Sequence, residues 1–82
     1  MTVALMWEAK APEGRGGELL SWAREQGLDA SPQRRETFRA AGDRVLVITW
    51  WSAEISAELP ELPDPPRRLA ARPVHRWRFE QV

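Results

Sequence analysis

The chain has 82 residues and no cysteine, and its twelve basic side chains balance twelve acidic ones. The lack of cysteine excludes disulfides, zinc–thiolate sites and cysteine nucleophiles, and the length predicts one domain that spans residues 1–82. A fold of this size without such links needs efficient packing or a partner chain.

The first ten residues, MTVALMWEAK, contain an apolar run without a basic leader. The run is too short for a signal peptide or a membrane span, so we expect a cytoplasmic protein without a membrane partner. Residues 2–9 are apolar at both alternating sets of positions, which is typical of a strand buried on both faces.

The next regular element is a predicted helix over residues 17–26. Gly27 stands where a helix C-cap is expected, and the preceding loop is rich in proline and glycine. One face of this helix is mostly apolar, because its positions follow helical spacing: Leu19, Trp22, Ala23 and Gln26.

A β-hairpin is predicted after the helix. The stretch QRRETFRA, residues 33–40, alternates as a polar strand, and RVLVITWW, residues 44–51, forms an apolar one. Between them, Gly42 and Asp43 suit a tight turn with positive φ.

Residues 52–73 offer two places for a short second helix. The stretch SAEISAEL could form it ahead of Pro60, and DPPRRLAAR could form it with Asp64 as N-cap and Pro65 in the first turn. The sequence leaves open whether this helix begins near residue 52 or near residue 65.

The last element is a strand in VHRWRFEQV, residues 74–82. Its side chains alternate between an aromatic face and a charged face, with His75, Trp77 and Phe79 on the aromatic one. The full order is therefore β-α-β-β-(short α)-β, which predicts an α+β, ferredoxin-like antiparallel sheet with its helices on one face.

One sound helix can cover only one face of such a sheet. Strand 44–51 presents Leu46, Ile48 and Trp50 on one side and other apolar side chains on the opposite side. A buried aromatic side chain removes about 150–250 Å² of surface from water. If two or three such side chains stay in contact with water, the fold loses on the order of 10 kcal/mol of hydrophobic stabilisation. That rivals the stability of a small domain. We therefore expect a second copy with twofold symmetry; a ligand pocket or another protein are the alternatives.

The stretch VLVITWWSAE resembles the third strand and strand exit of the dimeric α+β barrel superfamily, whose best-known branch is antibiotic-biosynthesis-monooxygenase-like. Trp51, Ser52 and Glu54 stand at the matching places. The resemblance implies this fold and a homodimer. It carries over no catalytic residue. The family's second helix is usually long, whereas the matching segment of this chain is short and rich in proline. The histidines that the haem-degrading branch uses near the end of that helix have no counterpart in this chain.

Six side chains are candidates for a pocket or an interface: Trp7, Trp50, Trp51, His75, Trp77 and Phe79. His75 could act as a base or a ligand, but packing is the favoured interpretation because one histidine cannot build a three-ligand metal site by itself. We expect no metal and no cofactor, and the catalytic residues, if any, stay unknown.

Three functional hypotheses follow. The leading one is a small homodimeric domain that binds an apolar or aromatic small molecule between sheet and helix. The second is a cofactor-independent monooxygenase of an aromatic substrate, for which the chain has no tyrosine to orient a phenol. The third is a protein-interaction module that uses the arginine face of the last strand or the proline segment.

Nucleic acid is not an expected partner. Residues 67–82 hold five arginines against Glu80 alone, but the net charge is zero. The strand 44–51 also lacks the glycine-and-aromatic signature of RNA-binding sheets.

Overall fold

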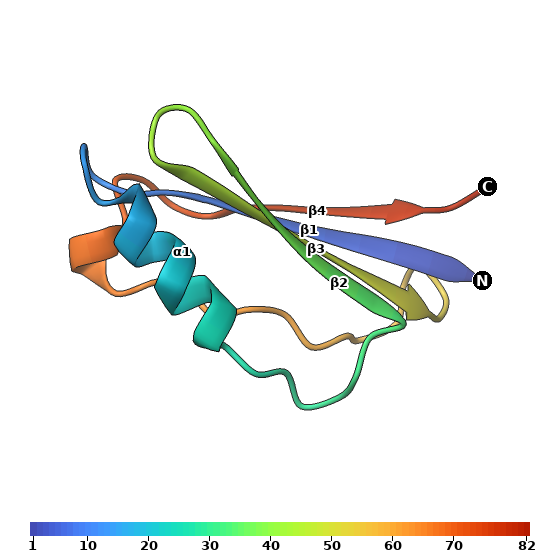
Figure 1. The fold of residues 1–82 in the computed structure, drawn as a ribbon. Helices are drawn as coiled ribbons and strands as arrows, with labels where there is room; N and C mark the ends of the chain where they lie inside the picture. Colours follow the sequence, from blue (N-terminus) through green and yellow to red (C-terminus); the bar gives the residue numbers. More distant parts are fainter.

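The computed structural model describes residues 1–82 and contains one antiparallel sheet and one α-helix (Figure 1). The elements are β1 (Thr2–Lys10), α1 (Gly16–Glu25), β2 (Arg34–Ala40), β3 (Arg44–Ser52) and β4 (His75–Glu80). The four strands lie in the order β2-β3-β1-β4, so β1 and β3 are central. The sequence prediction of these five elements is confirmed to within one or two residues at each end. No helix is long and apolar enough to cross a membrane.

The two central strands bury every second side chain. In β1, Val3, Leu5 and Trp7 are almost fully buried, and in β3 the same holds for Val45 and Val47. The side chains between them point to the opposite face and stay partly exposed. Within a single chain, β1 is therefore buried on one face only, because all covering elements lie on that side.

The expected second helix is absent. Residues 53–74 contain one turn of 3₁₀ helix, η1 (Arg67–Leu69), and no α-helix. The stretch before Pro60 is too short to offset the cost of helix nucleation, and a proline disfavours helical geometry in the residue before it. The same rule keeps Pro65 out of a helix because Pro66 follows it. Asp64 therefore caps no helix.

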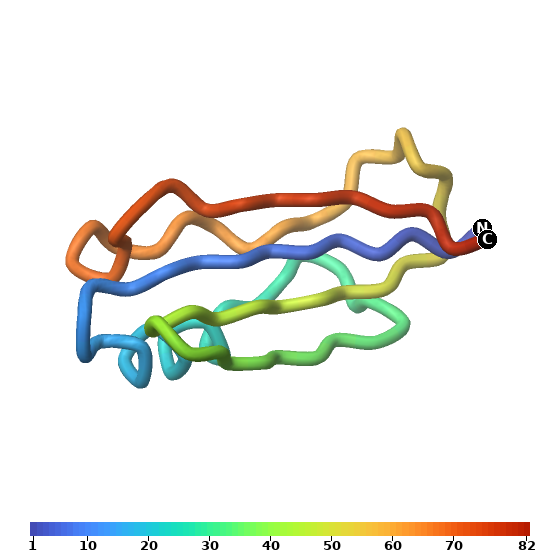
Figure 2. The backbone as a smooth tube through the Cα atoms, turned by 90° about the horizontal axis from the view of Figure 1, so that it is seen from above, coloured from blue at the N-terminus to red at the C-terminus, as the bar shows by residue number.

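The proline-rich segment, residues 53–74, runs back along the sheet on the same side as α1 (Figures 1 and 2). The charged face of β4 holds it there. Arg76 donates a hydrogen bond to the carbonyl oxygen of Leu62 at 2.8 Å, and Arg78 donates one to the carbonyl oxygen of Ala57. An irregular segment thus takes the place of a second helix.

The core lies between the sheet and these two covering pieces. Helix α1 contributes Leu19 and Ala23 to it, and the proline-rich segment contributes Leu62 and Leu69. The Trp7 ring stacks on Trp22 of α1, with ring centroids 6.0 Å apart. One face of the sheet is therefore closed by the chain itself.

Candidate functional site

The other face of the sheet carries the candidate site, because no segment of the chain lies over it (Figures 1 and 2). We call it the open face. Strand register places its central rows: Ile48 lies opposite Met6, and Met6 lies opposite Trp77 on β4. The open face consists of Thr2, Ala4, Met6, Glu8, Lys10, Arg34, Glu36, Phe38, Ala40, Arg44, Leu46, Ile48, Trp50, Ser52, His75, Trp77 and Phe79.

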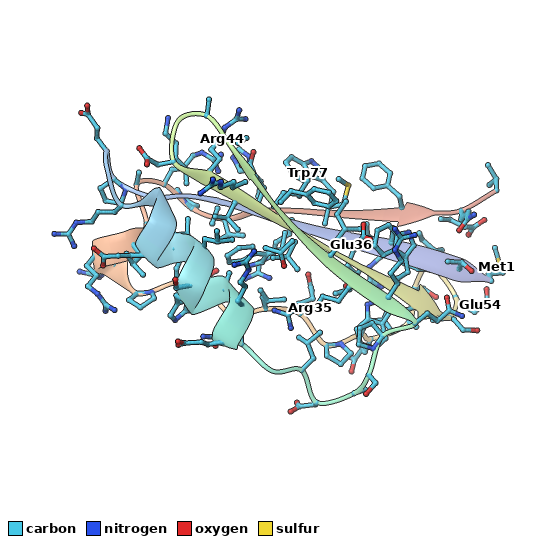
Figure 3. The ribbon with its side chains drawn as sticks, in the orientation of Figure 1. Met1, Arg35, Glu36, Arg44, Glu54 and Trp77 are labelled. Atoms are coloured by element: carbon cyan, nitrogen blue, oxygen red, sulfur yellow. The ribbon has the colours of Figure 1, made fainter.

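Three aromatic side chains on this face are unusually exposed. Phe38 is 45% exposed, Trp77 is 43% exposed and Phe79 is 53% exposed. Figure 3 shows Trp77 pointing away from the side of the sheet that α1 covers. Leu46, Ile48 and Trp50 between the edge strands are partly exposed. The result is a continuous apolar surface across all four strands.

The six residues singled out from the sequence do not form one cluster. Trp50, His75, Trp77 and Phe79 lie on the open face, and the predicted aromatic face of β4 is thereby confirmed. Trp7 and Trp51 are buried on the opposite side of the sheet. Their polar atoms are already bonded: the Trp7 indole N–H donates to the carbonyl oxygen of Pro63, and that of Trp51 donates to the Thr49 hydroxyl.

The space between the sheet and the proline-rich segment is filled by side chains. A hollow beside Leu5, Trp7 and Val47 measures about 10 Å³, which is about the volume that one water molecule needs. The covered face therefore offers little room for a ligand beneath Leu62 of the proline-rich segment.

A larger hollow lies on the open face, toward the β2–β3 turn. Its volume is about 200 Å³, and most of its lining is apolar. Phe38 on β2 and Trp77 on β4 flank it, and Met6 and Leu46 of the central strands form its floor. Its remaining walls come from Glu8, Arg39, Ala40, Arg44 and Val45.

Glu8 is the one acidic residue that lines this hollow, and its side chain is only 16% exposed. Arg72 donates a hydrogen bond to it, while a guanidinium nitrogen of Arg44 lies 3.6 Å from its carboxylate and His75 Nδ1 lies 3.7 Å away. A carboxylate surrounded in this way is poorly placed to remove a proton from a ligand. Sequence analysis missed Glu8, although a lone acid in an apolar strand is a usable signal.

His75 also contacts the ring of Trp77 edge to face, with centroids 5.5 Å apart. It is the only histidine of the chain, and the structure contains no group of three or more side chains suited to hold a metal ion. His75 and Glu8 together form a polar border beside the aromatic surface.

Comparison with known proteins adds no further constraint. No protein-family model, curated protein or solved structure matches the chain. Fold and site together define a small α+β domain whose four-stranded sheet has one covered face and one open apolar face. The affiliation with the dimeric α+β barrel proteins is a proposal.

Proposed function

We propose that the protein is a homodimer in which two open faces pack against each other, sheet on sheet. The single observation that carries this proposal is the apolar open face, with Phe38, Trp77 and Phe79 each about half exposed. Contiguous exposed apolar patches beyond a few hundred Å² mark interaction sites in soluble proteins.

The topology supports a ferredoxin-like assignment and the dimeric α+β barrel architecture. The chain follows the order β-α-β-β-β, and β3 lies between β1 and β2 in the sheet. The single departure is the proline-rich segment, which stands where a second helix is expected. A sheet with helices on one face only leaves its second face for a partner.

The size of the open face is compatible with a dimer of moderate affinity. Four strands about 4.8 Å apart and about six residues long cover roughly 20 by 20 Å of flat sheet, and the protruding side chains add to this area. Two such faces approach the total of about 1,000–1,200 Å² that marks the lower limit of specific interfaces. We therefore expect dissociation in the micromolar range.

A second copy is the best partner because the face is complementary to itself. Its centre, at Met6 and Ile48, is apolar, and a twofold axis brings the same patch of each copy together. Both acidic groups of the face pair within the chain: Glu36 contacts Arg34, and Glu8 contacts Arg72. The centre of the face carries no unpaired charge, so its chemistry does not favour a partner of opposite charge.

Sedimentation equilibrium between about 1 and 100 µM tests the dimer. The wild-type chain is expected to dimerise across this range, and Ile48→Lys is expected to be monomeric because a charge at the centre of the interface would be desolvated. Ile55→Lys is the matched control, since Ile55 is 38% exposed and lies outside the open face. A wild-type chain that is monomeric at every concentration contradicts the proposal.

Within the dimer, we propose a binding role for a small aromatic molecule rather than catalysis. This rests on the hollow of about 200 Å³ beside Phe38 and Trp77.

The monooxygenase hypothesis has less support, because Glu8 is engaged by cations. Oxygen uptake with anthrone-like or quinol substrates tests it directly. The interaction-module hypothesis loses support at β4, whose arginines already bind the proline-rich segment.

A further inference from the structure

We propose that the hollow beside Phe38 and Trp77 binds a small planar aromatic anion, such as an aromatic carboxylate, and that the second copy of the chain closes the site. The inference rests on the proposed homodimer and adds the site, the class of ligand and the linkage between binding and dimerisation.

The size and lining of the hollow favour a small, flat, apolar ligand. A volume of about 200 Å³ is below the range of about 300–1,000 Å³ found for drug-sized ligands, so one or two fused rings fit and a dinucleotide or a folded peptide does not. Phe38 and Trp77 offer ring faces or edges at the two sides. Met6, in the floor, adds a sulfur that packs well against aromatic rings.

The charge at this end of the open face selects an anion. By strand register, Lys10 and Arg44 lie side by side on the row next to Glu8. Arg72 reaches the same carboxylate from the proline-rich segment. Two arginines therefore contact the one carboxylate, and Lys10 adds a further positive charge beside Arg44. The local excess of positive charge favours an anionic ligand.

Arg44 is the residue best placed to bind that anion. Its Nε donates to the carbonyl oxygen of Ala41 at 3.0 Å, and its closest contact with Glu8 is 3.6 Å, longer than a hydrogen bond. A guanidinium has five N–H donors, so donors are left for a ligand carboxylate. Such charge-assisted pairs are among the stronger hydrogen bonds in proteins.

The hollow is open on the side away from the sheet. In a single chain, a bound ring would keep one surface in water, so burial would be incomplete. A second sheet packed on the open face covers that surface, and a ligand that binds only the dimer stabilises the dimer by mass action.

Isothermal titration of the full-length chain with 2-naphthoate tests the site, with 2-naphthamide and 2-naphthylmethylammonium as uncharged and cationic comparators. We expect naphthoate to bind at least about tenfold more tightly than either comparator. Arg44→Gln is expected to lower the naphthoate affinity by about tenfold and to leave the amide unaffected. Arg24→Gln is the control, because Arg24 is exposed on α1 and makes no hydrogen bond or ion pair.

The outcomes separate this inference from the proposed dimer. A wild-type dimer that binds no naphthoate at millimolar concentration overturns the ligand site and leaves the dimer standing. Equal affinity for acid and amide, or preference for the cation, overturns the assignment of an anion. Ile48→Lys is expected to lose naphthoate binding together with dimerisation, and full binding by that folded monomer overturns closure by the second copy.

Discussion

The carboxylate of Asp43, in the turn between β2 and β3, accepts a hydrogen bond of 3.1 Å from the backbone N–H of Gly16 at the start of α1. Its second oxygen accepts one of 3.0 Å from the N–H of Gly14. Helix α1 has no side-chain cap within its own sequence. A residue of the hairpin therefore supplies the acceptor and the negative charge that a helix N-terminus favours.

Asp43→Ala is expected to lower the free energy of unfolding by about 1–3 kcal/mol. The change removes both hydrogen bonds, and it places an alanine at a φ of 59°, where a non-glycine residue without a polar side chain is strained. Urea denaturation measures the loss. Asp43→Asn keeps an acceptor and tolerates this backbone geometry, so it should cost less than half as much; equal losses would contradict the capping role.

Two adjacent glycines are expected to respond in opposite directions to alanine. A Cβ at Gly16 would lie 2.8 Å from Asp43 Oδ1 and 2.9 Å from its Cα, whereas a Cβ at Gly17 meets nothing within 4 Å. Gly16→Ala should therefore weaken the contact between α1 and the hairpin and lower the melting temperature. Gly17→Ala should raise stability by about 0.5–1 kcal/mol, because alanine is the better helix former. Thermal denaturation by circular dichroism checks both, and similar stability of the two variants would refute the close approach.

Arg35 connects β2 to the end of α1. Its guanidinium donates hydrogen bonds to the carbonyl oxygens of Gln26, at 2.6 Å, and Ala23, at 2.9 Å. Arg35→Met should cost about 1–3 kcal/mol, because charge-assisted bonds to carbonyls of the last helical turn are lost. Chemical denaturation measures the effect. Arg24→Met is the matched control and should change stability by less than about 0.5 kcal/mol.

A fourth prediction concerns Thr49, a buried polar residue of β3. Its hydroxyl accepts a hydrogen bond of 2.9 Å from the indole N–H of Trp51. Thr49→Val keeps the shape but leaves that N–H without a partner, so a loss of about 1–3 kcal/mol is expected.

Urea denaturation compares this variant with Thr37→Val, a control on the neighbouring strand β2. Thr37 is only partly buried and makes no side-chain hydrogen bond in the structure, so its loss should be small. Equal effects of the two changes would show that the Thr49–Trp51 bond contributes little.

Several features of the molecule were accessible from the sequence. Alternation with period two identified β2 and β4, continuous apolar runs identified β1 and β3, and helical spacing identified α1. The pair Gly42–Asp43 identified the hairpin turn, where both residues have positive φ. The aromatic face of β4 followed from the same alternation. These properties depend on residues close in sequence, whose backbone preferences and side-chain directions are local.

The tertiary structure decided what depends on the path of the chain. Whether residues 53–74 form a helix, and which face of the sheet they cover, depends on where the prolines allow the segment to run. The ion pair of Glu8 with Arg72, 64 residues apart, and the cap of α1 by Asp43 join distant positions. No local pattern specifies such pairs, because they form only when packing of the whole chain brings them together. The sequence by itself therefore determined the elements and their two-sided apolar character, and only the three-dimensional arrangement decided which side is left open.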